Sequence, residues 1–323
     1  MIFDGHSDIF ADVTIKRLEG ETDVLRNHHL KRLKKGGVEG SIFVIWIDPP
    51  YDKQPVPRSK EIMKAIRDEM AETEDFVIVH NTAEMEKAKA EGKFYIYIGL
   101  EGVSYIGSDV DKIDELYDFG ARHCMLTWNE TNDLATGAQG DPDRGLTEAG
   151  VKAVKKIQQL GMLMDVSHLN DKSFWDVMRV ATGPVIASHS NARALSNAAR
   201  NLTDDMLMEI KKTGGLVGMN SFNLFVSQEI ENQRIERLVD HIVYISDKIG
   251  VEHVGFGFDF FEFLNPAGMS SYSDQDTSYT RGLEDATKVP ELLRLMEKAG
   301  FNKEEMEAIK YKNWHNLIKK VVG

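Results

Sequence analysis

Short apolar segments alternate along this chain with longer amphipathic ones. Most of the apolar segments are continuous rather than alternating, which is typical of strands buried on both faces. The strand-then-helix alternation predicts an α/β fold. The eight expected strands are Met1–Gly5, Ser41–Ile47, Phe94–Leu100, Arg122–Thr127, Met162–Ser167, Pro184–Ser188, Leu216–Asn220 and His253–Phe258.

The amphipathic segments predict helices between and after these strands. Ser108 or Asp109, Thr147 and Thr203 are suited to begin three of them, and several should end at a glycine such as Gly214. We expect the last two helices to close an outer ring. The expected ranges are Ile62–Glu72, Ala83–Glu91, Lys112–Phe119, Thr147–Leu160, Ser173–Val180, Asp204–Lys212, Ile235–Ile249, Pro290–Ala299 and Lys303–Val322.

Eight strand–helix units in 323 residues fit a single (β/α)8 barrel spanning residues 1–323. The rival is a doubly wound open sheet, which usually has a glycine-rich phosphate turn after its first strand. Here the first strand is followed by His6, Ser7 and Asp8 instead. The segment Phe260–Thr287 is too long for an idle connection, and we interpret it as a candidate lid.

Composition narrows the class of protein. Hydrophobic residues make up 42% of the chain and charged residues 28%, which fits a packed soluble core. The net charge of −13 argues against nucleic acid and anionic membranes as partners. The single cysteine, Cys124, excludes an internal disulfide and a cysteine-rich zinc site. Without a membrane helix, signal peptide or lipid-anchor signal in the pattern, we expect a cytoplasmic protein.

Residues of metal-ligating type close five of the apolar runs: His6, Asp8, Glu101, His168, His189 and Asp259. The functional side chains of such a barrel lie at the carboxyl ends of its strands, so these residues should meet at one rim. His6 and Asp8 are two residues apart and can bind one ion, while His168 and His189 bind a second and Glu101 lies between. This set predicts a barrel of the metal-dependent hydrolase type with two metal ions.

Each of these residues also has a purely structural explanation. A histidine at a strand end is often a hydrogen-bonded core residue, Glu101 could pair with a basic side chain, and Asp259 could cap the next segment. Five such strand ends together favour a metal site, because buried unpaired charges are costly. The other histidines do not close strands, and we expect them to be surface or packing residues: His28, His29, His80, His123, His241, His253 and His315.

Five motifs in order resemble the membrane (renal) dipeptidase family of zinc peptidases. They are DGHSD at 4–8, GLEG at 99–102, DVSH at 165–168, ASHS at 187–190 and GFGFD at 255–259. The similarity runs nearly end to end and points to a soluble, bacterial-type member.

The resemblance implies a dipeptidase with two zinc ions per chain that hydrolyses dipeptides, including those with a C-terminal D-residue, through a metal-bridging hydroxide. His6 and Asp8 would bind one zinc ion, His168 and His189 the other, and Glu101 would bridge them. By the same resemblance, Asp259 would serve in proton transfer and Arg200 would hold the substrate carboxylate. A homodimer is also implied.

Two positions depart from the family pattern. Trp128 stands where the family usually has a histidine, and Phe261 replaces an acidic residue. Trp128, Asn129 and Phe225 complete the candidate substrate-binding residues. Two alternatives stay open: a related binuclear amidohydrolase acting on another amide, and a barrel that binds a ligand without turnover.

Overall fold

Eight parallel strands form the barrel of this computed structural model, which describes residues 1–264 and 279–323. They follow the order β7-β6-β5-β4-β2-β1-β9-β8, and a parallel bridge between Ala187 and Val217 joins the two ends of the sheet. The strands are β1 (Ile2–Ser7), β2 (Val38–Trp46), β4 (Phe94–Glu101), β5 (Ala121–Met125), β6 (Leu163–Asp165), β7 (Val185–Ile186), β8 (Val217–Met219) and β9 (Val254–Phe256). The predicted (β/α)8 barrel is confirmed. Part of the candidate lid, 265–278, lies outside the described residues.

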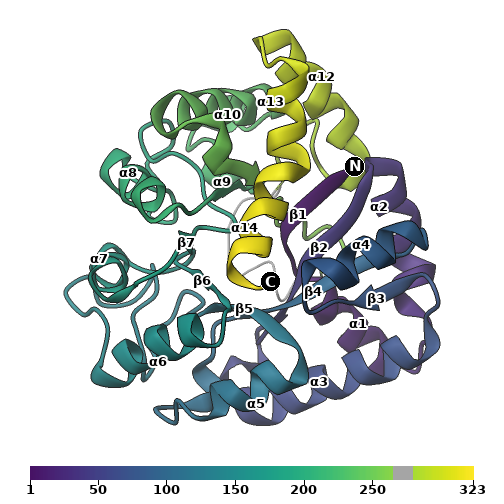
Figure 1. Cartoon of the computed structure of the whole chain (residues 1–323), viewed down its shortest axis with the longest axis vertical. Coiled ribbons are helices and arrows are strands. Elements are labelled where there is room, and N and C mark those ends of the chain that lie inside the picture. The colour runs from purple at the N-terminus through teal and green to yellow at the C-terminus, as the bar shows by residue number, and fades with distance from the viewer. Residues whose placement is uncertain (265–278) are drawn as a thin grey trace.

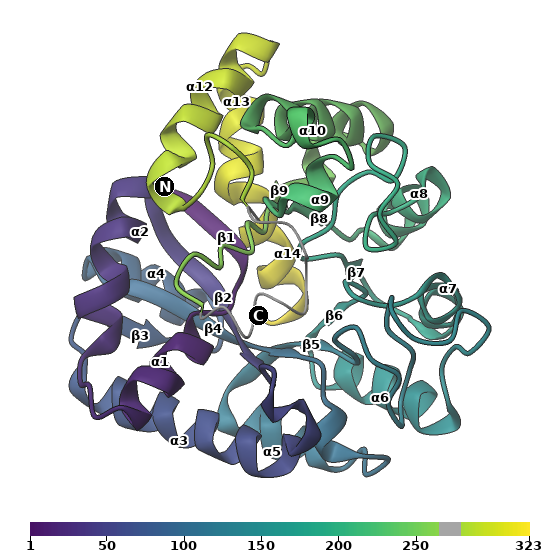
Figure 2. The same ribbon diagram turned by 180° about the vertical axis from the view of Figure 1, so that it is seen from behind.

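Helices surround the strands on all sides (Figures 1 and 2). Thr147 and Thr203 cap α6 and α8 as predicted, whereas neither Ser108 nor Asp109 caps α5, which follows Asp111. The helices are α1 (Ile9–Leu18), α2 (Lys31–Gly36), α3 (Pro55–Glu72), α4 (Thr82–Ala90), α5 (Lys112–Phe119), α6 (Glu148–Gln159), α7 (Asp171–Val180), α8 (Asp204–Thr213), α9 (Asn223–Val226), α10 (Ile235–Ile249), α12 (Val289–Ala299), α13 (Lys303–Glu307) and α14 (Asn313–Val321).

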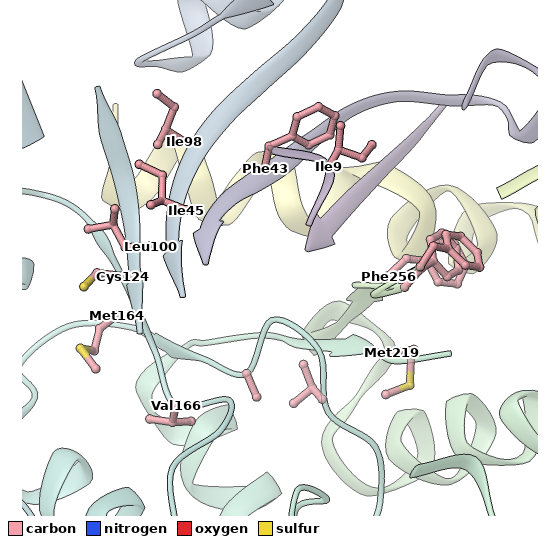
Figure 3. Close-up of a cluster of buried hydrophobic side chains, with 14 of the residues drawn as sticks. Ile9, Phe43, Ile45, Ile98, Leu100, Cys124, Met164, Val166, Met219 and Phe256 are labelled. Atoms are coloured by element: carbon pink, nitrogen blue, oxygen red, sulfur yellow. The ribbon is translucent and has the colours of Figure 1, made fainter. Parts of the chain in front are cut away.

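The continuous apolar strands supply two separate cores. In β4, Ile98 and Leu100 face outward to the helices, while Tyr95 and Tyr97 face the barrel interior. Figure 3 shows the outer layer, with alternate residues of neighbouring strands pointing to the same side. Because successive side chains of a strand point to opposite faces, Glu101 continues the inward row of Tyr95 and Tyr97.

Four elements were not predicted: α1, α2, α9 and β3. The helices α2 and α9 are short, with six and four residues. The helix α1 begins directly after Asp8, and its first six residues, Ile9–Thr14, are all buried, so no polar face marks them as helical. The strand β3 (Phe76–Ile78) pairs with β4 outside the barrel path. Its three residues are too few to give a periodic signal.

The last helix, α14, does not join the outer ring, and that prediction is wrong. It lies across the amino-terminal end of the barrel (Figure 1), where Trp314 is fully buried against Phe3. The indole N–H of Trp314 donates to the carbonyl oxygen of Phe256 at 2.9 Å. A side chain at Gly5 would place its Cβ 2.2 Å from this indole, so the close approach requires glycine.

No helix within residues 1–264 and 279–323 is long and apolar enough to span a membrane.

Candidate metal centre

A bulge at the end of β1 directs His6 and Asp8 toward the barrel axis. The pairing of β1 with β2 shifts by one residue between Asp4 and Ser7. Such a bulge re-aims the side chains that follow it. His6 and Asp8 are both buried, with His6 Nε2 3.8 Å from Asp8 Oδ2. The two side chains therefore share one side of the rim, as the sequence predicted.

Glu101 turns one carboxylate oxygen to each side of the rim. Its Oε2 lies 3.4 Å from His6 Nε2, and its Oε1 lies 2.9 Å from His168 Nε2 and 3.9 Å from His189 Nε2. The side chain is buried at the end of β4. Among the described residues, the basic side chains within 4 Å of this carboxylate are these histidines alone. Glu101 is therefore not stabilised by an ion pair with a lysine or an arginine.

His168 and His189 form the other half of the rim. Their Nε2 atoms are 2.8 Å apart, so both nitrogens point at the same small volume. The opposite ring nitrogens are fixed: His168 Nδ1 lies 2.9 Å from Asn129 Oδ1, and His189 Nδ1 lies 2.8 Å from Ser188 Oγ. Fixing one nitrogen in this way orients the other for a metal.

The donor set fits metal ions. Among the described residues, the buried atoms His6 Nε2, Asp8 Oδ1 and Glu101 Oε2 have no hydrogen-bond partner. Orphaned buried polar atoms are rare in a folded protein, and several pointing at one place indicate an ion. Two overlapping triads bring their ligand atoms within 4.8 Å of one another, one of His6, Glu101 and His189 and one of His6, Asp8 and Asp259.

Burial and neighbouring charges shift the pKa values at the rim. Burial lowers the pKa of His168 and of His189 well below the usual value, which leaves neutral imidazoles, the form that binds metal. Burial also lowers the pKa of His6, but the carboxylates of Glu101 and Asp8 outweigh it and raise that pKa well above normal. Burial raises the pKa of Asp8 to about 6. The cluster thus concentrates acidic groups where cations would relieve their repulsion.

Asp259 reaches the rim from the end of β9. Its Oδ1 lies 3.7 Å from His6 Nε2, and its Oδ2 accepts a hydrogen bond from Asn220 Nδ2 at 3.0 Å. Burial raises the pKa of this carboxyl to about 6. Asp259 and His168 are two of the three described non-glycine residues with positive φ, at 58° and 71°. Backbone in this region is unfavourable and gathers at functional sites.

Arg200 borders the rim beyond His189. It is 8% exposed, and its guanidinium donates to Ser190 Oγ and to the carbonyl oxygen of His189, both at 3.4 Å. The guanidinium carbon also lies 5.3 Å from the centroid of the Phe225 ring. The structure thus brings two of the predicted substrate-binding residues, Arg200 and Phe225, together beside His189.

A cavity of about 260 Å³ lies beside Glu101, which forms part of its lining. Trp46 and Trp128 form its aromatic wall, with ring centroids 5.5 Å apart, and Asp52 and Glu130 also line it. Trp128 is half-buried, and its ring centroid lies 6.2 Å from that of His168. An indole at this position offers one N–H donor and no titratable proton.

Asn129 and Phe261 contact other side chains of the protein instead of facing the cavity beside Glu101. The Asn129 side chain is buried, and its oxygen is engaged by His168, so its visible task is to orient that ring. Phe261 stacks on Tyr279 and packs against Phe222, so its surroundings are apolar.

Several supporting residues were not predicted as part of the site: Asn220, Asp165, His123 and Ser188. His123 was interpreted as a packing or surface residue, and it is fully buried in the barrel, 2.6 Å from Asp165. The one feature of the sequence that could have indicated this pair is Asp165, an acidic residue three positions before His168. Nothing in the sequence pairs it with a histidine in another strand.

A closed parallel barrel that gathers three histidines and three carboxylates at the carboxyl ends of its strands is typical of metal-dependent hydrolases. The family model of the membrane dipeptidases, peptidase family M19, matches residues 1–322. The chain belongs to this family, and the resemblance seen in the motifs is confirmed.

Individual relatives agree with this family. An uncharacterized dipeptidase of Schizosaccharomyces pombe is 33% identical over 224 residues, which cover 68% of this chain and 51% of that protein. The chain thus spans about half the length of this relative. The solved structure of dipeptidase AC, a metallopeptidase of family M19, superposes with a TM-score of 0.86 at 28% identity, covering 100% of this chain and 98% of that chain.

A metallopeptidase from Rhodobacter sphaeroides, solved with a phosphinate mimic of the dipeptide L-Ala-D-Ala, superposes with a TM-score of 0.87 at 26% identity. It covers 99% of both chains.

Proposed function

We propose that this protein is a zinc-dependent dipeptidase that accepts dipeptides with a C-terminal D-residue. The observation that carries the proposal is the arrangement of Glu101, whose two oxygens face His6 on one side and His168 on the other. The family assignment and the dipeptide mimic bound by the Rhodobacter sphaeroides neighbour support it.

In this proposal, His6 and Asp8 would hold one zinc ion, His168 and His189 would hold the second, and Glu101 would be a ligand of both. When bound, two such ions supply an activated water near neutral pH and polarise the scissile carbonyl. His and carboxylate ligands suit zinc, with other first-row divalent ions as competitors. Asn129 contributes by holding the His168 ring in its metal-facing orientation.

The two charged ends of a dipeptide give the site its substrate class. Arg200 binds the terminal carboxylate, because its planar donor fork matches that group. Phe225 packs beside the guanidinium, and Trp128 borders the substrate on the cavity side. Asp259 meets the free amine and moves a proton toward the leaving amine, a task suited to a carboxyl with a raised pKa. Longer peptides lack a carboxylate at the required distance.

The test is hydrolysis by the zinc-reconstituted full chain. L-Ala-L-Ala, L-Ala-D-Ala and L-Ala-L-Ala-L-Ala are each incubated with and without a chelator, and released alanine is quantified. We expect chelator-sensitive cleavage of both dipeptides and none of the tripeptide. Absence of dipeptide cleavage by protein that holds two zinc ions would contradict the proposal and favour another amide substrate or a ligand-binding barrel.

A homodimer and a cytoplasmic location complete the proposal. The homodimer rests on the family resemblance alone, and the location is supported by a lone cysteine, Cys124, that is free and buried. Light scattering of the purified protein tests the first, and fractionation of the producing cells tests the second.

A further inference from the structure

The carboxylate of Asp165 joins the two strand ends that carry His168 and His189. It is fully buried at the end of β6. Its Oδ1 accepts hydrogen bonds from the backbone N–H of Ser167 at 2.8 Å and of Ser188 at 3.1 Å. Each serine directly precedes one of the two histidines. One oxygen atom therefore fixes the backbone immediately before both.

The backbone ladder between β6 and β7 ends at Asp165. The ladder between β6 and β7 consists of two pairs, of which Asp165 with Ile186 is the last. Beyond it, the backbone N–H of Val166 donates to the Ile186 oxygen at 2.8 Å, and that of His189 donates to Ser167 Oγ at 3.3 Å. With so short a ladder, the separation of the two strand ends depends on side-chain hydrogen bonds.

His123 holds the other oxygen of Asp165. The distance from His123 Nε2 to Asp165 Oδ2 is 2.6 Å, and both residues are completely buried, His123 on the adjacent strand β5. Burial raises the pKa of Asp165, but the contact with His123 and the N–H donors outweigh it and lower the pKa to about 2. The group is therefore an anion lying beneath the rim, close enough that its charge acts on His168.

We propose that Asp165, braced by His123, is a positioning residue that sets the spacing of His168 and His189 and supplies a buried negative charge beneath the second zinc ion. The inference rests on the proposed function, since it concerns the zinc ion that these histidines would hold. It assigns a task to the buried contact between the Asp165 carboxylate and the His123 imidazole. Groups that orient metal ligands in this way typically contribute 10- to 100-fold to metal affinity.

A general structural role is the competing explanation, because removing one partner of a buried, hydrogen-bonded carboxylate destabilises a fold. The chain offers a matched control. Asp48 and Arg58 form a second buried pair, with two short contacts of 2.8 and 2.9 Å, and no contact to the ligands is recorded for it among the described residues. The replacements Asp165→Asn and Asp48→Asn both remove one buried charge and keep the side-chain shape.

The experiment measures zinc affinity of the full-length, metal-free protein by competition with a chromophoric chelator, alongside its thermal midpoint. For Asp165→Asn we expect one of two zinc equivalents to bind at least about tenfold more weakly. For Asp48→Asn we expect a lower thermal midpoint and wild-type affinity for both equivalents. Undiminished zinc affinity in Asp165→Asn, or an equal loss in Asp48→Asn, would overturn the inference.

Variants at His123 keep the test decisive if Asp165→Asn fails to fold. His123→Gln retains a donor toward Asp165 and should bind zinc more tightly than His123→Ala, which removes it. Equal zinc affinity in these two variants and wild type would overturn the bracing role. Wild-type protein that binds no zinc would instead contradict the proposed function, so the two failures are distinguishable.

Discussion

The two ends of the barrel close the same strands in opposite ways. At the amino-terminal end, Trp314 fills the opening and its one polar atom is satisfied by Phe256, while Asn313 donates to the carbonyl oxygens of Val251 and Val254. At the carboxyl end, the rim closes with three histidines and three carboxylates, several of whose buried atoms have no hydrogen-bond partner among the described residues.

The difference shows that the amino-terminal end contributes to the stability of the fold, whereas the carboxyl-end rim is destabilising without bound cations. Apolar packing stabilises the amino-terminal end, where the side-chain donors of Trp314 and Asn313 are both satisfied. The rim combines buried acids with left-handed backbone at His168 and Asp259, which is destabilising unless cations occupy it. If this comparison is correct, substitutions at the carboxyl-end rim should change catalytic activity more than the stability of the metal-free fold. Substitutions at the amino-terminal end should lower the stability of the fold and leave the rim able to bind zinc.

The largest effect is expected from Asp259→Asn at the rim. The amide keeps the shape and the contact to Asn220 but cannot transfer a proton, so dipeptide turnover should fall by a factor on the order of 10²–10⁴. Zinc content should stay at the wild-type value, as measured by elemental analysis of the same sample. Loss of zinc would make Asp259 a ligand, and unchanged turnover would remove it from proton transfer.

At the opposite end, Trp314→Ala should lower the free energy of unfolding by about 3–5 kcal/mol, because it leaves a large cavity in the barrel. Urea unfolding of the metal-free protein measures this loss. The folded fraction should still bind two zinc ions, and the comparison between the two ends fails if this variant loses them under native conditions.

Zinc should stabilise the rim and leave the other end unaffected. At a free concentration about 100 times the Kd, each bound ion raises the free energy of unfolding by about 2.7 kcal/mol, and a chelator should remove this increment. Thermal unfolding at graded zinc concentrations provides the measurement. The matched variant Glu101→Gln keeps the shape of the side chain without its charge, so zinc should raise its free energy of unfolding much less. An increase equal to that of the wild type would mean that zinc binds elsewhere.

A smaller effect is expected in the layer that supports the rim. His241 on α10 accepts the Ala192 N–H at Nδ1 and donates to the Val226 oxygen through Nε2, so it is neutral, and burial lowers its pKa to about 4. The unfolded chain then binds more protons than the folded one between about pH 6.5 and pH 4. Stability contributed by this group should therefore fall with falling pH, by up to about 1.4 kcal/mol per unit.

The non-titrating variant His241→Gln isolates this slope, since the amide preserves one acceptor and one donor. Urea unfolding at pH 7, 6 and 5 should show a weaker pH dependence in the variant than in the wild type. Parallel slopes would mean that His241 is not held neutral.

The sequence predicted the barrel because its buried strands are continuous apolar runs, and all eight occur close to the expected positions. It misplaced α14, since an amphipathic pattern identifies a buried face without saying which surface that face covers. Trp314 packs inside the barrel directly against Gly5 and Gly255, where any larger side chain would meet its ring. These glycines are far from Trp314 in the sequence, so no local pattern predicts the contact.

The grouping of the candidate ligands at one rim was predictable for a related reason. In a parallel barrel the residues that directly follow the strands must meet at one rim, so His6, Glu101, His168 and His189 could be grouped from order alone. The residues that orient them could not. His123 lies inside β5 and Asp165 is the last residue of β6, so their pairing depends on the register of these two strands, which only the structure provides.

The most direct test of the account is a crystal structure of the zinc-reconstituted protein with anomalous data collected at the zinc absorption edge. The account predicts two peaks at the rim, one between His6, Asp8 and Glu101 and the other between Glu101, His168 and His189. A single peak, or peaks away from Glu101, would contradict the binuclear centre on which the proposed dipeptidase depends.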